Sequence, residues 1–446
     1  MKKRLLPTFT LVLLTALVFG QTNPAITSWL QNTTVTGSYY TVAGGSTKIA
    51  NNILVNCQKV QYSTNFAYIT CTGIPSYATG PFQDGNPSQA TDQAAIFKMP
   101  LNPVQNTGTK TATTGGNIGI FINGVALFDY RDGVAWNNAT GALCGGPGNP
   151  MCAGGPMTPQ AWNRDAIPAE RAGFDCAKGH PAMGNYHHHQ NPSAFKLDLT
   201  VVSTVCNLYD ADGLYKIDST KHSPLIGFAY DGCPIYGAYG YKNLDGTGGI
   251  TRMKSSYQLK TATTRTNGPA VATPYVAGYF REDYEYVANT SSDYLDASNG
   301  RICKTPEYPN GIYCYFATVD AKWNSTYPYI VGPTFYGTVA AAKVASITET
   351  VSTYLKTPTN EVFADLNITI FPNPSADLIA IQLGDLVKED YNVELIDLMG
   401  KVIKTTQINK GSTIAYFDTQ ALYAGTYFVK IANGQAHTTR KVVITK

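Results

Sequence analysis

Histidine is scarce in this sequence and strongly clustered. Six histidines occur in 446 residues, and four of them lie between His180 and His189. Three follow one another in the run GNYHHHQNP at residues 184–192. Neutral imidazole is the commonest side-chain ligand of transition-metal ions, so the cluster indicates a candidate metal site.

Strand geometry sorts these histidines into two sets. Successive side chains of a β-strand point to opposite faces, so His187 and His189 are expected to project together while His188 points the other way. His180 lies across a turn made by Pro181–Gly184 and is expected to fold back toward them. The pattern therefore predicts three imidazoles that share one side of a hairpin.

A more distant histidine, His222, opens the stretch HSPLIGFAYDG and is a candidate fourth ligand. The predicted metal ligands are His180, His187, His189 and His222. Three or four nitrogen ligands with few thiolates suit Zn(II) or Cu(II).

Two other interpretations of the cluster remain open. Histidine and tyrosine side chains in a β-rich core can form a hydrogen-bonded network without an ion. Alternatively, three imidazoles leave an open position where a metal-bound water could react, as in extracellular metal enzymes. Such an enzyme needs a general base, and Asp175 is the nearest acidic candidate, although it could equally cap a turn.

The elements that would position these residues occur twice. The stretches IGIFINGVALF (118–128) and IGFAYDGCPIY (226–236) both read as a strand, an Asn-Gly or Asp-Gly hairpin turn and a returning strand. Downstream, DCAKGH (175–180) matches DASNGR (296–301), and GNYHHH (184–189) matches GIYCYF (311–316). The sequence thus predicts an internally duplicated body.

The two halves of this body, approximately residues 21–195 and 196–340, differ at the candidate site. In the matched segments His180, His187 and His189 become Arg301, Cys314 and Phe316. The metal site is therefore expected in the first half.

Composition and periodicity favour a mainly β fold. The chain has 41 glycines, 25 prolines and 30 tyrosines, and short β-branched or aromatic runs such as Ala67–Thr72 and Lys196–Val205 read as strands. A short helix is expected at Pro159–Arg171. A polar, weakly helical stretch from 341 to 365 reads as a linker.

The N-terminal residues 1–20 read as a secretory signal peptide, with a basic start followed by an apolar run. A second apolar run of about 20 residues is absent, so no transmembrane helix is expected in the mature chain. A net charge of +3 without a basic cluster argues against nucleic acid as a partner.

Nine cysteines in an oxidising compartment favour disulfides. Sequence proximity suggests four pairs and leaves Cys233 over. The expected pairs are Cys57/Cys71, Cys144/Cys152, Cys176/Cys206 and Cys303/Cys314.

The histidine segment resembles a known family. Tyr186-His187-His188-His189, preceded by Gly179-His180-Pro181, is similar to the motif that names the YHYH-domain family, with His188 where a second tyrosine is usual. The segments HSPLIGFAYDGCPIYG (222–237) and TPEYPNGIYCYFAT (305–318) resemble two further family segments, the last with Cys314 and Phe316 in place of histidines. The resemblance covers roughly residues 118–337 and implies no particular reaction.

The C-terminal residues 366–446 resemble a second family. The segments ITIFPNPS (368–375), VELIDLMGKVI (393–403) and LYAGTYFVKI (422–431) are similar to the type A sorting domain of the type IX secretion system of Bacteroidetes. By pattern alone they predict a small immunoglobulin-like β-sandwich of six or seven strands. The resemblance implies recognition by the type IX machinery, passage across the outer membrane and removal of this domain.

These observations predict a secreted, extracellular or outer-membrane-attached protein that binds a transition metal through its histidine cluster. The alternatives are an extracellular metal-dependent enzyme and a surface interaction module whose histidines and tyrosines are structural.

Overall fold

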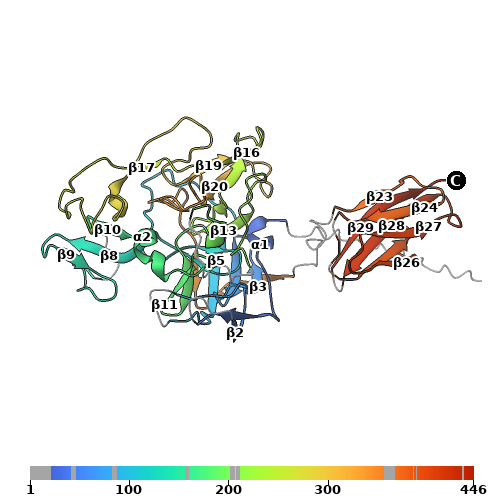
Figure 1. Cartoon of the computed structure of the whole chain (residues 1–446), viewed down its shortest axis with the longest axis horizontal. Coiled ribbons are helices and arrows are strands. Elements are labelled where there is room, and N and C mark those ends of the chain that lie inside the picture. Colours follow the sequence, from blue (N-terminus) through green and yellow to red (C-terminus); the bar gives the residue numbers. More distant parts are fainter. Residues whose placement is uncertain are drawn as a thin grey trace, which may run out of the picture. The chain divides into compact units, whose positions relative to one another are not determined.

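The computed structural model describes residues 22–41, 47–82, 88–155, 160–200, 206, 211–355, 367–384, 386–387, 389–433 and 436–446. The predicted signal segment 1–20 lies outside these residues. The chain divides into two compact units at Tyr354/Leu355. Strands dominate both units, which confirms the mainly β class (Figure 1).

An eight-stranded sheet is the centre of the first unit (Figure 1). Its strands, in spatial order, are β11 (His180–Ala182), β12 (Asn185–His188), β7 (Ala126–Phe128), β6 (Asn117–Phe121), β13 (Leu225–Ala229), β14 (Pro234–Tyr236), β20 (Ile312–Phe316) and β19 (Gly300–Cys303). In each half of the sheet, the outermost two strands pair antiparallel, the next pair is parallel and the third is antiparallel. The two halves meet where β6 and β13 pair antiparallel. The order of pairings therefore reads the same from both edges.

The two predicted hairpins, β6–β7 and β13–β14, are present. Their turns contain Gly124 and Gly232, with φ of +79° and +83°, a left-handed conformation that glycine adopts without steric cost. The residue before each glycine also stabilises the turn. The Asn123 side chain accepts a hydrogen bond from the Val125 amide, and the Asp231 side chain accepts one from the Cys233 amide. Local turn chemistry thus explains both hairpins.

A five-stranded antiparallel sheet packs on this central sheet. Its order is β21 (Ala342–Val344), β5 (Ala95–Pro100), β4 (Phe66–Cys71), β3 (Cys57–Tyr62) and β22 (Ser352–Tyr354). Buried side chains of both sheets, including Ile69 and Phe97 from one and Ile120 and Phe228 from the other, form a single core cluster. Burial of these faces is the main force that holds the sheets together.

The outer strands of this sheet correct the predicted linker. Residues 342–344 and 352–354 form β21 and β22, which pair with β5 and β3, so a linker from 341 to 365 begins too early. These strands are short and largely exposed. Their shortness and exposure fit the edge of a sheet, where one side of the strand faces water. Residues 356–366 lie outside the described part of the chain.

Two other local predictions meet different outcomes. The strand expected at Ala67–Thr72 is β4. The strand expected at Lys196–Val205 is not found: its first two residues belong to a 3-10 turn, η2 (Phe195–Leu197), and residues 201–205 are not described. The helix expected at Pro159–Arg171 is shorter, as α2 (Ala166–Glu170) followed by η1 (Arg171–Gly173). Asp165 begins α2, because its side chain accepts a hydrogen bond from the Ile167 amide.

Smaller elements surround the two sheets. They are α1 (Pro24–Thr27), η4 (Arg281–Asp283), the sheet β10 (Asn163–Asp165), β8 (Arg131–Asn137) and β9 (Ala142–Cys144), and the two-stranded pairs β1 (Thr36–Tyr39) with β2 (Ile49–Leu54), β15 (Tyr239–Tyr241) with β16 (Ile250–Arg252), and β17 (Tyr257–Leu259) with β18 (Tyr284–Tyr286).

Two of the four predicted disulfides form, Cys144–Cys152 and Cys176–Cys206. Cys57 and Cys71 are directly opposed on β3 and β4 but remain thiols, and Cys303 and Cys314 remain thiols on β19 and β20, as does Cys233. The Cβ atoms of directly opposed strand residues are about 4.5–5.5 Å apart, whereas a disulfide needs about 3.5–4.5 Å. The Cys57 and Cys71 thiols instead donate to the carbonyl oxygens of Ile122 and Gly124.

The second unit contains two antiparallel sheets. One has the order β23 (Thr369–Phe371), β24 (Leu378–Gln382), β27 (Ile414–Asp418), and the other β26 (Val402–Ile408), β25 (Tyr391–Ile396), β28 (Gly425–Asn433), β29 (Ala436–Ile444). Apolar side chains of both sheets, such as Ile381, Phe417 and Ile431, share one core. This arrangement fits the expected immunoglobulin-like sandwich. In the described residues, every helix is too short or too polar to span a bilayer.

Candidate metal centre

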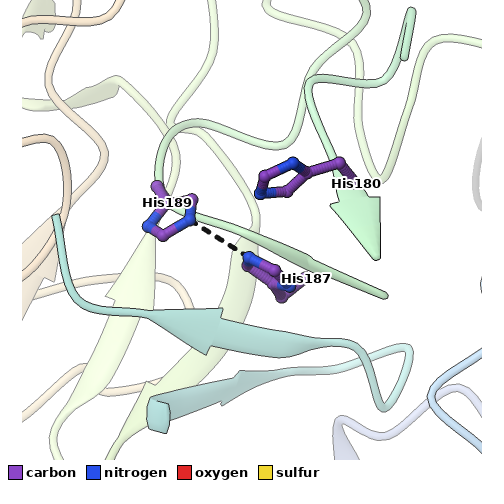
Figure 2. A group of neighbouring side chains, drawn as sticks. All are labelled: His180, His187 and His189. Atoms are coloured by element: carbon purple, nitrogen blue, oxygen red, sulfur yellow. Dashed lines mark hydrogen bonds between the residues drawn. The ribbon is translucent and has the colours of Figure 1, made fainter. Parts of the chain in front are cut away.

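Three histidines meet at one edge of the eight-stranded sheet (Figure 2). His180 on β11 pairs directly with His187 on β12, and His189 follows β12. One ring nitrogen from each lies within 4.8 Å of the other two. The three residues are buried, with exposed fractions of the whole residue of 8% for His180, 1% for His187 and 3% for His189. The predicted hairpin therefore brings these three imidazoles together.

Backbone carbonyls orient two of the rings. The Nδ1 of His187 lies 2.9 Å from the Asn185 oxygen, and the Nδ1 of His189 lies 2.5 Å from the Asp129 oxygen. Because a carbonyl can only accept, each Nδ1 must carry the hydrogen. In the neutral ring Nε2 then presents a lone pair, which is how protein groups usually orient a metal-ligating histidine.

The two lone pairs face each other across a short distance. The Nε2 atoms of His187 and His189 are 3.1 Å apart (Figure 2). Two neutral imidazoles in this orientation repel, so a cation must lie between them, either a proton or a metal ion. Burial, reinforced by the positive charge of His189, holds the pKa of His187 well below its ordinary value.

Aromatic rings surround the group. Phe128 on β7 stacks on the His187 ring at 3.8 Å between centroids, and Phe174 contacts the His180 ring edge-on at 4.9 Å. These rings fix the imidazoles and exclude water from most of the cluster. Such an apolar wall strengthens electrostatic interactions inside a site.

Glu170, the last residue of α2, is a charged side chain at the cluster that sequence reasoning missed. Its Oε2 lies 3.4 Å from the Nε2 of His180 and 3.3 Å from the Nε2 of His189. Burial alone would raise the pKa of Glu170 and lower that of His189, but the contact between them reverses both directions. The only sequence signal was an acidic residue in the short helix expected before the histidines.

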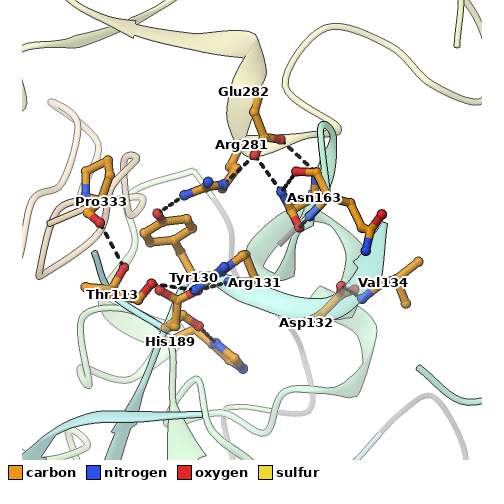
Figure 3. Close-up of polar contacts among 12 residues, drawn as sticks. Thr113, Tyr130, Arg131, Asp132, Val134, Asn163, His189, Arg281, Glu282 and Pro333 are labelled. Carbon is orange, nitrogen blue, oxygen red and sulfur yellow. Dashed lines mark hydrogen bonds and ion pairs between the residues drawn. The ribbon is translucent and has the colours of Figure 1, made fainter. Parts of the chain in front are cut away.

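A second layer of polar contacts holds the backbone beside His189 (Figure 3). The Arg131 guanidinium bonds to the Asp129 carboxylate, 2.5 Å away, and to the Thr113 carbonyl oxygen at 2.7 Å. Asp132 pairs with Arg164. Burial raises the pKa of Asp132 to about 6, against the opposing effect of Arg164. These contacts fix the Asp129 carbonyl that orients His189.

A cavity of about 380 Å³ lies against β8 and the loop that follows β9. Its wall includes Arg131, whose guanidinium bonds to Asp129, and the Asp129 carbonyl contacts His189, so the cavity lies near the histidine cluster. The other lining residues include Asp132, Gly133, Val134, Gly145, Asn149, Met151 and Cys152.

His188 points away from the other histidines, as strand alternation predicts. Its Nδ1 lies 3.0 Å from the Lys178 carbonyl oxygen, and its Nε2 lies 2.8 Å from the Tyr77 hydroxyl. Burial lowers the pKa of His188 to about 3. This ring is therefore a neutral part of the core.

Asp175, the base candidate from the sequence, has a structural role. Its carboxylate accepts hydrogen bonds from the Gly179 amide at 3.1 Å, the Tyr186 hydroxyl at 2.8 Å and the Gly80 amide at 3.1 Å. It thus caps the turn before β11, the second of the two roles considered for it.

His222 is not brought to the cluster, which corrects its prediction as a fourth ligand. Its ring contacts Tyr236 and Tyr241, with centroids 5.1 and 4.8 Å away, and its Nδ1 lies 2.7 Å from the Ser223 oxygen. The reason is topological. His222 precedes β13, and β13 and β14 occupy the half of the sheet that ends in β19.

Comparison with known families agrees with this organisation. The model of the YHYH protein family matches residues 96–328, which include both hairpins and all three clustered histidines. The model of the secretion system C-terminal sorting domain matches residues 369–445, the β-sandwich of the second unit. Among curated proteins none matches the chain.

The two matches define the chain. The sorting domain indicates secretion, with the cell surface or the medium as destination, and recognition by the secretion machinery. The YHYH match spans more than half of the 446 residues and contains Tyr186-His187-His188-His189, the segment that resembles the naming motif with His188 in place of the second tyrosine. The chain therefore belongs to the YHYH protein family.

Proposed function

We propose that the body is a secreted metal-binding module, which holds one Zn(II) or Cu(II) ion through the Nε2 atoms of His180, His187 and His189. The observation that carries this proposal is the approach of two Nε2 lone pairs to 3.1 Å, with both Nδ1 atoms committed to backbone carbonyls. Imidazole nitrogens are ligands that both ions accept.

The distance between the two Nε2 atoms is compatible with a shared metal. Charge-assisted hydrogen bonds are about 2.7–2.9 Å long. Four ligands at 2.0–2.1 Å around a tetrahedral ion are about 3.3 Å from one another. The 3.1 Å between His187 and His189 lies between these values. A proton on His189, paired with Glu170, is the competing description.

Metal analysis of the purified, secreted protein tests the proposal. One equivalent of ion is expected in the wild type and none in His187→Ala or His189→Ala. His188→Ala is the matched control, because its ring lies on the opposite face and contacts Lys178 and Tyr77. A chelator should lower the melting temperature of the wild type and leave His187→Ala unchanged.

The same measurement can reject a metal function. This would be the case if the wild type carries no ion and its melting temperature changes neither with chelator nor with added Zn(II) or Cu(II). The site would then be a hydrogen-bonded network of His189 and Glu170. Equal losses in all three alanine variants would also contradict the proposal, since His188 should not matter.

A metal-dependent enzyme is the second candidate, and the cavity beside β8 favours it. Its volume of about 380 Å³ is within the range of small-molecule sites, and Asp132 on its wall is electrostatically coupled to Glu170. This function needs an open coordination position at the ion.

We also propose the remaining domain assignments. Residues 1–20 act as a signal peptide, 21–340 contain two halves related by duplication, and 366–446 direct export through the type IX machinery before removal. The palindromic strand order of the eight-stranded sheet supports the duplication. A chain ending at Leu355 keeps β22 and should fold but fail to reach the cell surface; unfolding of this truncated chain would contradict the division.

A further inference from the structure

We infer that Glu170 is the fourth protein ligand of this centre, which makes it a closed site of three imidazoles and one carboxylate. The inference rests on the proposed metal function and goes beyond it. It distinguishes a site that only holds its ion from a catalytic site with an open coordination position. It starts from the position of the Glu170 side chain against two of the three histidines.

The contact distances suit shared coordination better than hydrogen bonding. Glu170 Oε2 is 3.3 Å from the Nε2 of His189 and 3.4 Å from the Nε2 of His180. Both values exceed the roughly 2.7–2.9 Å of a charge-assisted hydrogen bond and match the roughly 3.3 Å ligand separation of a tetrahedral ion. With the 3.1 Å between His187 and His189, three ligand separations are close to the tetrahedral value.

The side chain of Glu170 is partly exposed, but its Oε2 atom is buried and faces the imidazoles of His189 at 3.3 Å and His180 at 3.4 Å. A buried carboxylate oxygen that faces imidazoles is costly unless a cation compensates it. A divalent ion would supply this charge and satisfy all four groups at once.

The fold places Glu170 on the side of the cluster that water can reach. Its side chain is 24% exposed, whereas those of His180 and His189 are 10% and 3% exposed. Glu170 lies outside the group of atoms within 4.8 Å of one another, so its carboxylate must move toward His187 when the ion binds. This movement would cover the open side of the three imidazoles.

The functional consequence follows from the coordination number. Metal sites with four protein ligands hold the ion, whereas catalytic sites keep a position for water or substrate. A Glu170-closed centre therefore stores, carries or is stabilised by its ion. The set of three nitrogens and one oxygen is compatible with Zn(II) and Cu(II).

Cobalt substitution of the full-length secreted chain tests this inference. Co(II) replaces Zn(II) and absorbs strongly only when four-coordinate. The wild type should show the intense tetrahedral bands and no spectral change on addition of azide. Glu170→Ala should bind Co(II) at least 10-fold more weakly, with weaker bands that respond to azide, and Glu170→Gln should behave similarly. Glu285→Gln, an exposed glutamate on β18, is the matched control and should match the wild type.

Two results would overturn the inference. If wild-type Co(II) protein responds to azide and Glu170→Ala keeps the wild-type affinity, the site is open and the enzyme candidate gains support, while the three-histidine proposal stands. If wild-type protein binds no Co(II), Zn(II) or Cu(II), both proposals fall together. Circular dichroism of each variant establishes that a lost spectrum is not caused by unfolding.

Discussion

The two halves of the eight-stranded sheet build the same hairpin with different side chains at its centre. Asp175 accepts bonds from the Gly179 amide and the Tyr186 hydroxyl, and Asp296 accepts the same bonds from Gly300 and Tyr313. All four hydrogen bonds are 2.8–3.1 Å long. The framework of the turn and strand is therefore the same in both halves.

The difference lies on the face where the histidines point. Arg301 pairs with Cys314 across β19 and β20, where His180 pairs with His187 across β11 and β12. The Arg301 guanidinium donates to the backbone carbonyls of Tyr241, at the end of β15, and Lys242, and it lies over the Phe316 ring. Because the hairpin forms without histidine in the second half, the fold does not require the imidazoles, and a ligand explains them better.

Replacing the first-half set by its second-half counterparts should have the largest effect. The variant His180→Arg/His187→Cys/His189→Phe is expected to fold, because the same set is accommodated in the other hairpin. Its metal content should fall from one equivalent to none, as measured by elemental analysis. Retention of one equivalent would place the ion elsewhere in the chain.

A buried ion pair distinguishes the turns of the two halves. In the first half, the Lys178 Nζ and Asp198 Oδ1 atoms are 2.6 Å apart and both side chains are buried. In the second half, Asn299 stands at the position of Lys178 and donates to the Phe316 and Ile330 carbonyls. Asp198→Ala leaves an unpaired buried charge and should lower the free energy of unfolding by about 3–5 kcal/mol in urea titrations. Asn299→Ala should cost only about 1–3 kcal/mol.

A double variant provides the control for this pair. Lys178→Met/Asp198→Leu removes both charges and should return close to the stability of the wild type, since an apolar pair avoids the cost of burying ions. If the double variant is as unstable as Asp198→Ala, lost packing rather than the unpaired charge explains the effect.

The shared framework should respond equally in both halves. A Cβ atom at Gly179 would lie 2.4 Å from the Tyr186 hydroxyl, and one at Gly300 would lie 2.4 Å from the Tyr313 hydroxyl. Gly179→Ala and Gly300→Ala should each reduce stability by about 1–3 kcal/mol in the same urea titration. A neutral substitution in one half would show that the two turns are less alike than their hydrogen bonds indicate.

Acid sensitivity should show the smallest difference. The folded-state pKa of His188 is about 3, below the unfolded value of about 6.5. The contribution of this group to the free energy of unfolding is therefore fully present above pH 6.5 and is lost as the pH falls, because only the unfolded state gains the proton. Between pH 6 and pH 5 this linkage costs about 1 kcal/mol. His188→Gln keeps one donor and one acceptor and should remove that loss, measured against metal-free wild type by urea titration at both pH values.

Local patterns carried most of what the sequence could predict. Asn123-Gly124 and the alternation at His187 and His189 are encoded within a few residues, so the hairpins and the three-imidazole group were predicted correctly. His222 and Glu170 depend on tertiary topology. His222 precedes β13, and the order of strands in the sheet separates β13 from β12 by β7 and β6. The spacing of residues along the sequence does not reveal this order.

The disulfides and the linker show the same limit. In each of the pairs Cys144–Cys152 and Cys176–Cys206 at least one cysteine, Cys152 or Cys176, lies outside the strands and can adjust to the bond, whereas Cys57 and Cys71 are held at strand spacing by β3 and β4. Residues 342–344 are only three residues long, Ala-Lys-Val, and carry no strand signal of their own. They become β21 because β5 offers an unpaired edge.

The four candidate ligands also lie within one short stretch of chain, from Glu170 to His189. An unfolded chain keeps such groups at high effective concentration, because closing a loop of this length costs little entropy. The denatured ensemble can therefore chelate the same ion, and any affinity it retains is subtracted from the stabilisation of the native state. A small rise in melting temperature would then be compatible with tight binding, and the ion could be captured while the rest of the sheet is still forming.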